Sequence, residues 1–494
     1  MNKFIQNHPA LFQRMLEIFP GLSSWFIITM PVWLSLFHPA LVAYFVIIFD
    51  VYFFYKSASM AVYSGMAYLK MTAHAQVDWH ADLIKQKDWM KIQQLVVIPT
   101  YKEPVYKLEK TLDYIAATDF PLKNISVVLG MEEREGGEAK EREIIIRKKY
   151  QGKFGHLWAT YHPDIQGEVK GKASNEAYSC KWAKKEFDKM GISLKDVIIT
   201  SCDADSLLPP KYFSYLTNSY LIDQNRDYHF FHAPVLLYSN FWEVPLVVRV
   251  KSTLDSIIRM ANLMRPDKLI QVSTYSVSLW LIDNVGYWDT DIIPEDWHIF
   301  MQAFFKHGER VSTVPIFLPI MGDAVKSPTY FSTLKSRYEQ ERRWAWGVTD
   351  IPYAVKKYFT TPEIPFWPKT LRILRLLESH LLWPVNFFIL TLGASIPPLV
   401  NPAFSRTILG HNLPRVSGFI LTLSTVFMLI LLYVDAKTRP PRPEKFSLLK
   451  MPLLLFQWVF LPVISFFFSS LPGLDAHTRL MLGKRLEYKV TEKV

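Results

Sequence analysis

Apolar residues are concentrated toward both ends of the chain. Near the N-terminus, residues 21–37 contain no charged side chain, and a second apolar stretch follows directly. A helix needs about 20 apolar residues to cross the hydrocarbon core of a bilayer. We therefore predict about two membrane helices, at residues 21–38 and 40–60, within an N-terminal membrane region of residues 1–84.

Apolar residues return in the C-terminal part of the chain. Residues 379–400 and 416–434 contain no Asp, Glu, Lys or Arg, and residues 452–471 form a third apolar segment that Pro462 interrupts. The sequence therefore predicts a C-terminal membrane region, residues 376–494, with about three transmembrane or re-entrant segments and a basic tail.

Basic residues orient these segments, because Lys and Arg accumulate on the cytoplasmic side of a membrane. They occur in the loop after the second C-terminal segment and in the tail: Lys437, Arg439, Arg442, Lys445 and Lys450, then Arg479, Lys484, Arg485 and Lys489. A complete crossing by residues 452–471 would place these two groups of basic residues on opposite sides of the membrane. Either this segment re-enters the membrane or the tail departs from the rule. We expect a multi-pass protein of the plasma (inner) membrane whose central domain is cytosolic.

The central part of the chain, residues 85–330, has the composition of a soluble domain. Short β-branched runs at residues 95–98, 125–129 and 196–200 predict buried strands, and charged, helix-compatible segments lie between them. Strands that alternate with helices are typical of a parallel, Rossmann-like α/β sheet. Ligands of such sheets bind beyond the carboxyl ends of the strands, so the residues after these runs are the first candidates for a site.

The overall composition narrows the class of protein. Half of the residues are hydrophobic, and the formal net charge is +11. No nucleic-acid motif accompanies this charge, so we assign it to cytoplasmic residues that flank membrane helices and expect no nucleic-acid partner. Two cysteines, Cys180 and Cys202, offer neither a disulfide framework nor zinc-ligand spacing, and we expect them to be buried thiols.

The first candidate motif, Asp203-Ala204-Asp205, follows the third predicted strand. Two carboxylates at positions i and i+2 of an extended turn can face one site. Mg²⁺ and Mn²⁺ prefer oxygen ligands and commonly bind one or two carboxylates together with substrate phosphates. Such a pair also occurs in ordinary surface turns, and its place at the end of a strand is what favours a metal site.

A second acidic pair, Glu295-Asp296, follows Pro294. A carboxylate near a metal–phosphate site can accept the proton of an attacking hydroxyl group. Acidic residues also stabilise the first turn of a helix through the helix dipole. Both interpretations can hold together, because the dipole leaves the carboxylate oxygens available.

The most specific string is QERRW at residues 340–344. On a helix, Gln340, Arg343 and Trp344 fall on one face. A guanidinium group can bind phosphate through two hydrogen bonds, and an indole can stack on a sugar ring. The alternative is an amphipathic helix on the membrane surface, and we expect interfacial helices over residues 331–375.

In this order the motifs resemble the family 2 inverting glycosyltransferases with a GT-A domain, in particular the membrane-integrated branch of cellulose, chitin and hyaluronan synthases. The resemblance covers about residues 92–350. It implies an α/β Rossmann-like GT-A domain inserted between N-terminal and C-terminal transmembrane helices, with amphipathic interfacial helices. It also implies a metal-dependent hexosyltransferase that uses a nucleotide diphosphate sugar.

The resemblance assigns roles to individual residues. Asp205 and Asp203 would bind Mg²⁺ or Mn²⁺, Asp203 would also contact the nucleotide, and Asp296, beside Glu295, would be the catalytic base. Gln340, Arg343 and Trp344 would hold the diphosphate and the acceptor sugar. The remaining donor-binding residues would be Pro99, Thr100 and Glu103 after the first strand, Glu132 and Glu133 after the second, and Lys172 and Asn175 in the segment GKASNEA.

One departure concerns the nucleotide. The family usually has an aspartate after the second strand that helps to bind the nucleotide base, whereas this chain has Glu132 and Glu133. Glutamate can do the same from a retracted backbone. The resemblance favours a uridine nucleotide, with guanosine as the alternative.

Three functions remain open at this point. The first is polysaccharide synthesis, with the polymer threading between the membrane helices. The second is transfer of a single sugar to a lipid-linked acceptor. The third is a non-catalytic membrane scaffold, which the intact motifs disfavour. The expected partners of the first two are a nucleotide diphosphate sugar, a carbohydrate or lipid-linked acceptor, and membrane lipids.

Overall fold

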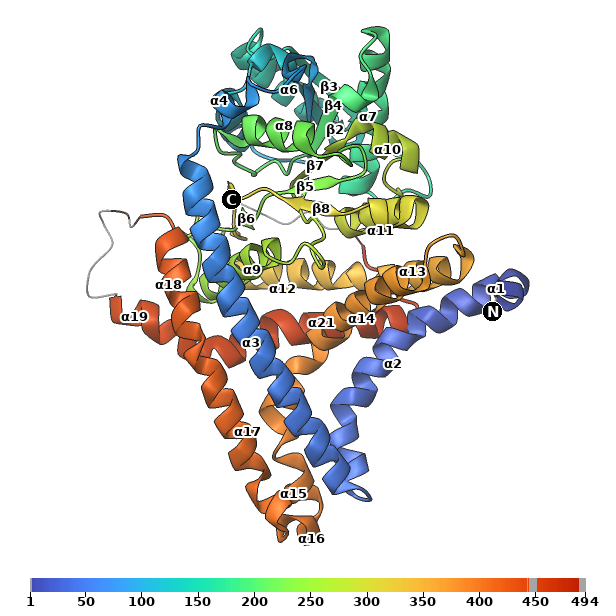
Figure 1. Ribbon diagram of the computed structural model, residues 1–494, viewed down its shortest axis with the longest axis vertical. Helices are drawn as coiled ribbons and strands as arrows, with labels where there is room; N and C mark the ends of the chain where they lie inside the picture. The colour runs from blue at the N-terminus through green and yellow to red at the C-terminus, as the bar shows by residue number, and fades with distance from the viewer. Residues whose placement is uncertain (1, 442, 444–450, 488–494) are drawn as a thin grey trace.

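The apolar ends of the chain form a helical membrane region beneath an α/β domain (Figure 1). The computed structural model describes residues 2–441, 443 and 451–487. Within these residues, five helices are long and apolar enough to cross a membrane: Pro9–Ser35 (α2), Pro39–Gln76 (α3), Phe366–Gly393 (α14 and η7), Ile408–Thr438 (α17 and α18) and Gln457–Met481 (η9 to α21). The two predicted N-terminal helices are present but longer than predicted, because their outer, more polar turns continue the helix beyond the charge-free runs.

The main sheet of the α/β domain contains β1 (Gln93–Pro99), β2 (Ile125–Glu132), β3 (His156–His162), β4 (Val197–Ser201), β5 (Phe230–His232), β7 (Tyr275–Ser278) and β8 (Thr313–Pro315). The strand order is β3-β2-β1-β4-β7-β5-β8. β3, β2, β1 and β4 are parallel, as the sequence predicted, whereas β7 is antiparallel to both β4 and β5. Before β7 the chain leaves the sheet to form α9 (Leu246–Leu263), and it re-enters from the opposite end.

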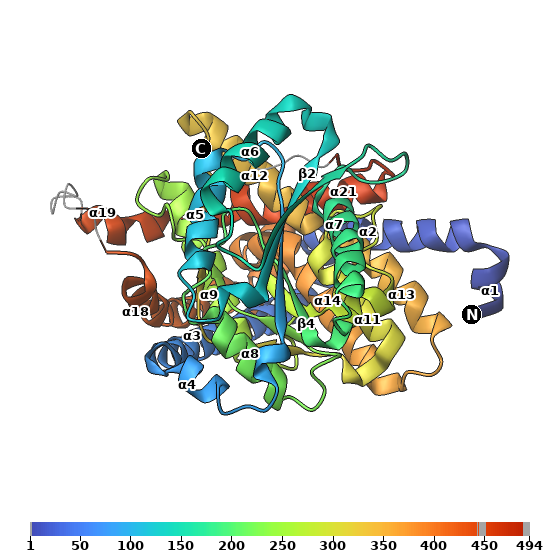
Figure 2. The same ribbon diagram turned by 90° about the horizontal axis from the view of Figure 1, so that it is seen from above.

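Burial on both faces explains the continuous apolar sequence of β1. Val96 and Ile98 face α5 (Val105–Ala116) in one core cluster. Leu95 and Val97 face α7 (Lys172–Lys189) in another. Seen from above, α5 and α8 lie on one side of the sheet and α7 and α11 on the other (Figure 2).

The register of the parallel strands sets the position of the site. β1 pairs Pro99 with Gly130 of β2 and Val97 with Ser201 of β4. The segments that follow these three strands therefore leave the sheet at one edge, as expected for a ligand-binding edge. A two-stranded ladder of β6 (Val235–Leu236) and β9 (Ile320–Met321) lies close to the same edge, because Leu207, just after β4, bridges to Met321.

Among the described residues, seven of the remaining α-helices cover the sheet or lie between it and the membrane helices: α4 (Trp79–Leu83), α6 (Gly137–Tyr150), α8 (Tyr212–Ile222), α10 (Leu279–Val285), α11 (Glu295–His307), α12 (Tyr330–Ala345) and α13 (Asp350–Thr360). Three short helices of the described chain pack against the membrane helices instead: α1 (Asn2–Asn7) and α15 (Ile396–Val400) against α2, and α16 (Pro402–Ser405) against α17. α9, α12 and α13 occupy the layer between the sheet and the membrane helices (Figure 1).

The last apolar segment lies across the bundle rather than along α3 and α17 (Figures 1 and 2). It runs from α19 (Met451–Phe456) through α20 (Leu461–Ser465) to α21 (Leu471–Met481), with a non-helical residue at Phe468. α21 packs against α2, α12 and α14, and α20 packs against α9. This placement favours the re-entrant alternative over a complete crossing.

Contacts on both sides of this segment agree with that placement. Before it, the Trp242 indole nitrogen donates to the carbonyl oxygens of Pro440 and Pro441, at 3.2 and 3.0 Å. After it, Leu486 packs against the core of the α/β domain. Both flanking segments therefore lie on the side of the α/β domain. The basic residues Arg442, Lys445, Lys450 and Lys489 lie outside the described residues.

Candidate active site

A cavity of about 1720 Å³ lies where the carboxyl ends of β1, β2 and β4 face the membrane-side helices. The predicted site residues that line it are Pro99, Thr100, Glu103, Glu132, Lys172, Asn175, Asp203, Asp205, Glu295, Asp296, Gln340, Arg343 and Trp344. Glu133 does not line it: this residue begins the 3-10 turn after β2, and its side chain is exposed. The structure thus does not place Glu133 in the cavity wall with the other predicted donor residues, because its side chain is exposed on this turn.

Lys172, at the start of α7, connects the two acidic motifs. Its Nζ lies 2.8 Å from Asp203 Oδ1 and 3.3 Å from Glu295 Oε1, and it donates to the Ser273 carbonyl oxygen at 2.8 Å. Burial lowers the pKa of Lys172, but Asp203, Glu176 and Glu295 outweigh burial and hold the pKa well above its ordinary value. Lys172 therefore remains a fixed positive charge between β4 and α11.

Glu295 and Asp296 form the first turn of α11, as the helix-dipole interpretation predicted. Burial raises the pKa of Glu295 to about 8, although Lys172 opposes this shift. Asp296 Oδ2 accepts from the Ser273 N–H and Oδ1 from the Trp297 N–H, both at 2.9 Å. Burial also raises the pKa of Asp296, although these two hydrogen bonds and the charge of Lys172 lower it in part. Asp296 is thus held in one orientation at the cavity wall with a raised proton affinity.

Asp203 and Asp205 leave the end of β4 and are fixed by neighbouring loops. The Ser273 hydroxyl donates to Asp203 Oδ2, and the Asp323 N–H donates to Asp205 Oδ2 at 2.8 Å. In the part of the chain that the structure describes, no group of three or more His, Cys, Asp or Glu side chains could hold a metal ion. The carboxylate oxygens of Asp203 and Asp205 fit a hard cation such as Mg²⁺ or Mn²⁺, with substrate phosphates as the remaining ligands.

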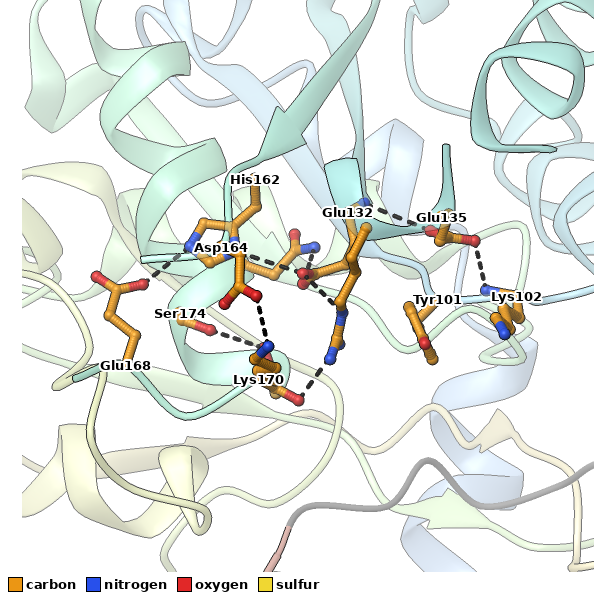
Figure 3. Close-up of polar contacts among 12 residues, drawn as sticks. Tyr101, Lys102, Glu132, Glu135, His162, Asp164, Glu168, Lys170 and Ser174 are labelled. Carbon is orange, nitrogen blue, oxygen red and sulfur yellow. Dashed lines mark hydrogen bonds and ion pairs between the residues drawn. The ribbon is translucent and has the colours of Figure 1, made fainter. Parts of the chain in front are cut away.

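Glu132 ends β2 within a buried hydrogen-bond network (Figure 3). The Asn175 amide donates to Glu132 Oε1 and to the Gly130 carbonyl oxygen, both at 2.9 Å. His162 lies between Glu132 at 3.4 Å and Glu168 at 2.9 Å. Burial lowers the pKa of His162, but the two carboxylates outweigh burial and raise it overall. The sequence did not indicate His162, because its strand has no clear apolar pattern.

A cation–aromatic contact forms the rim next to Glu132. The Arg134 guanidinium lies 4.1 Å from the centre of the Tyr101 ring and donates to the Lys170 carbonyl oxygen at 3.4 Å. Lys170 in turn pairs with Asp164 at 2.5 Å (Figure 3). Tyr101, Arg134 and Lys170 line the cavity and supply a flat ring and positive charge at the edge of β2.

α12 presents Gln340, Arg343 and Trp344 to the cavity from the membrane side. Gln340 accepts a hydrogen bond from Arg337, which is fully buried and also pairs with Glu341 on α12 and Asp255 on α9. A buried ionic network therefore fixes this face of α12 against α9. Sequence reasoning missed Arg337 because its partner on α9 is 82 positions away.

Two guanidinium groups lie close to the Trp344 ring. Arg337 lies 5.0 Å and Arg259 lies 5.4 Å from its centre. Arg259 lines the cavity and donates to the Val235 carbonyl oxygen at 2.8 Å. These two cation–ring contacts favour the position of the indole at the wall of the cavity.

An α/β sheet that gathers these acidic, basic and aromatic groups over a cavity at the membrane defines an enzyme domain built into a membrane protein. A family model described as "Glycosyl transferase family group 2" matches residues 198–468, which is more than half of the chain. The chain belongs to this family and is a family 2 glycosyltransferase. The expected fold class, a GT-A-type α/β domain between membrane helices, is confirmed.

Two solved structures are similar to this chain at low sequence identity. A mannosyltransferase, PcManGT, from Pyrobaculum calidifontis in complex with GDP-Man and Mn²⁺ is 14% identical with a TM-score of 0.40, over 79% of this chain and 98% of that one. S. aureus TarS 1-349 is 12% identical with a TM-score of 0.36, over 68% and 90% of the two chains. No curated protein matches the sequence.

Proposed function

We propose that the protein transfers a sugar from a nucleotide diphosphate sugar to a carbohydrate acceptor at the membrane, with inversion and with the help of Mg²⁺ or Mn²⁺. The observation that carries this proposal is that Asp203, Asp205, Asp296 and Arg343, distant in sequence, line one cavity. Membership of the glycosyltransferase family supplies the class of reaction.

In this proposal the donor lies along the edge of the parallel strands. The nucleotide, whose base is uracil or guanine, contacts Thr100, Glu132 and Asn175. The base can stack on the ring of Tyr101. Lys172, whose charge is fixed by its carboxylate neighbours, and Asp203 hold the donor near the end of β4. A cation held by Asp205 and Asp203 would neutralise charge on the diphosphate.

Transfer is a single displacement. The acceptor hydroxyl oxygen forms a bond to the anomeric carbon while the bond from that carbon to the diphosphate oxygen breaks, so the configuration inverts. Asp296 accepts the hydroxyl proton, a role that suits a carboxylate with a raised pKa and two backbone donors. Arg343 binds the departing diphosphate, and Trp344, held by its two arginine neighbours, offers a face to the acceptor sugar.

We infer that the α/β domain faces the cytosol of a plasma (inner) membrane. Arg439 and Lys484 flank the re-entrant segment on the side of this domain, and basic residues accumulate on the cytoplasmic side. Polysaccharide synthesis and transfer of one sugar to a lipid-linked acceptor share the chemistry described above. Their products differ in size, so electrophoresis of products made from radiolabelled donor separates them.

The experiment that tests the proposal is a screen of nucleotide sugars for metal-dependent release of nucleoside diphosphate by the purified protein. We expect release with one donor, and a fall of about 10²- to 10⁴-fold in Asp296→Asn, the usual contribution of a general base. Asp291→Asn is the matched control, because Asp291 is exposed and five residues earlier. Absence of release with every donor, or full activity of Asp296→Asn, would contradict the proposal.

A further inference from the structure

The cavity that holds the proposed catalytic residues continues into the membrane region and ends there. Its lining includes Leu390 and Thr391 of η7 and Leu421 and Ser424 of α17. Farther from the α/β domain, a buried cluster joins α2, α3 and α17: Met30, Val42, Ala43, Val46, Ala394, Phe404 and Leu413. None of these seven described residues lines the cavity. The cavity is therefore closed on the side of the membrane away from the α/β domain.

A belt of positive charge surrounds the cavity between the catalytic residues and its closed end. The cationic belt is defined here as Lys56, Arg265, Lys268, Arg372 and Arg375, all of which line the cavity. Glu378 pairs with Lys56 at 2.8 Å and Lys268 at 3.3 Å. Asp267 pairs with Arg265 and Arg375, each at 3.1 Å. Five cations against two carboxylates leave three positive charges, a surplus that attracts an anion.

Arg372 is the member of the cationic belt that lies against α11, the helix whose first turn contains the proposed base. Its guanidinium lies 4.8 Å from the centre of the Phe300 ring and 5.4 Å from that of Phe304. No carboxylate of the described chain forms an ion pair with it. Phe300 lies about one helical turn after Asp296 on α11, a rise of roughly 6 Å. Arg372 and Asp296 both line the cavity, so a group bound by Arg372 would share the cavity with the proposed base.

We propose that the acceptor carbohydrate is carried on a lipid whose headgroup contains phosphate, and that the cationic belt binds this phosphate. The hydrocarbon chain occupies the end of the cavity between α14 and α17, and the headgroup hydroxyl reaches Asp296. That hydroxyl displaces the nucleoside diphosphate from the anomeric carbon and gives its proton to Asp296. This inference rests on the proposed function. Charge complementarity and the closed end favour a lipid over a polymer, which needs an open path across the membrane.

A binding experiment tests the site without knowledge of the sugar. The full chain in phosphatidylcholine nanodiscs is titrated with farnesyl phosphate, farnesol and inorganic phosphate, and bound ligand is counted by native mass spectrometry. We expect farnesyl phosphate to bind at least about tenfold more tightly than farnesol, as one charge-assisted hydrogen bond allows. Equal binding of farnesol would overturn the proposal. Inorganic phosphate that binds as tightly as farnesyl phosphate would also overturn it, because the hydrocarbon chain would then add nothing to binding.

Two variants of one residue and a control keep the test specific. Arg372→Gln is expected to weaken farnesyl phosphate binding about tenfold, and Arg372→Lys, which keeps the charge, to weaken it less. Lys140→Gln is the control, because Lys140 is exposed on α6, outside the cavity lining. Unchanged affinity in Arg372→Gln would overturn the assignment of the phosphate to the belt.

The acceptor role is tested separately with radiolabelled donor sugar. We expect label to enter the organic phase on a phosphate-bearing lipid, with a raised KM for this lipid in Arg372→Gln. Label in water-soluble polymer, or equal transfer to free oligosaccharides, would overturn the inference while leaving the proposed function intact. Absence of metal-dependent nucleoside diphosphate release with any donor would instead contradict the proposed function.

Discussion

Some charged side chains in this protein are buried, and neighbouring groups of opposite charge offset the cost of their burial. Lys172 lies within 3.6 Å of three carboxylates, those of Asp203, Glu176 and Glu295. Their combined field keeps the ammonium group ionised despite burial. Because the same carboxylates flank the proposed donor site, the positions of the two acidic motifs depend on one lysine.

His298 is a second buried charge, and it makes stability depend on pH. Burial lowers its pKa, but Asp350 at 2.7 Å and Asp289 at 2.9 Å outweigh burial and raise it to about 9. The pKa of the folded state thus exceeds the ordinary value of about 6.5. The stabilisation is complete below pH 6.5 and is lost as pH rises through 9.

We expect wild-type protein in detergent to lose at most about 3 kcal/mol of unfolding free energy between pH 6.5 and 9.5 through this residue. Thermal unfolding followed by intrinsic fluorescence measures the change. His298→Gln should be less stable at pH 6 and show a weaker pH dependence. A variant whose melting temperature follows the same pH curve as the wild type would refute this role.

Gly130 is required by close packing rather than by its backbone angle. A β-carbon there would lie 2.1 Å from Asn175 Oδ1 and 2.7 Å from Ser179 Oγ. Gly130→Ala should therefore displace Asn175 from Glu132, at a cost of about 1–3 kcal/mol, and weaken nucleotide binding measured by calorimetry. Gly137→Ala is the control, because a β-carbon at Gly137 meets open space. Equal nucleotide affinity in both variants would show that Asn175 does not position Glu132.

The sequence indicated most of the side chains at the proposed site, because these residues occur in short motifs that can be recognised without the fold. Asp203, Asp205 and Asp296 occur in short strings beside a predicted strand end or a helix start. Residues such as His162 and Arg337 act through partners far away in the sequence, on β2 and α9. Nothing near them in the chain signals those contacts, so only the fold reveals them.

At the scale of elements, prediction succeeded where a strand is buried on both faces. β1, β2 and β4 are continuous apolar runs and were predicted nearly to their ends. β3, whose sequence HLWATYH is mostly half-buried, and the short β5, β7 and β8 were not predicted. Their strand conformation depends on pairing with neighbours rather than on their own pattern.

The contact between α9 and α12 depends on Arg337. This fully buried residue pairs with Asp255 and Glu341, and Lys251 balances the same two carboxylates. Arg337→Met would leave these carboxylates with one cation. We expect a loss of about 3–5 kcal/mol in stability, as for other broken buried ion pairs, together with a lower kcat because Gln340 loses its donor.

Lys335→Met is the matched control for this prediction, because Lys335 is exposed on the same helix. Thermal unfolding and nucleoside diphosphate release are measured on both variants. If Arg337→Met unfolds at the wild-type temperature and keeps wild-type kcat, the ionic network does not position α12.

At the scale of the whole molecule, the two ends of the described chain lie on the side of the α/β domain, and the turns after α2 and η7 lie on the other side (Figure 1). The sequence predicted the apolar segments but left the course of the last one open. Hydropathy measures how apolar a segment is, not its direction. The direction depends on the packing of α21 against α2, α12 and α14.

Cysteine labelling tests this topology, because Cys180 and Cys202 are both buried. A membrane-impermeant maleimide added to intact cells should label Arg406→Cys, in the turn after α16. Lys140→Cys on α6 and Lys484→Cys after α21 should react only after the membrane is permeabilised. Labelling of Lys484→Cys in intact cells would show that the last segment crosses completely.

The central claim is that the carboxylates at the end of β4 bind a metal ion together with a nucleoside diphosphate. Mn²⁺ binding followed by electron paramagnetic resonance, with UDP or GDP present, tests it most directly. We expect the nucleotide to tighten Mn²⁺ binding to the wild type and Asp205→Ala to weaken it at least about tenfold, whereas Asp291→Ala should not. Equal Mn²⁺ affinity in the wild type and Asp205→Ala would show that Asp205 does not bind the metal ion.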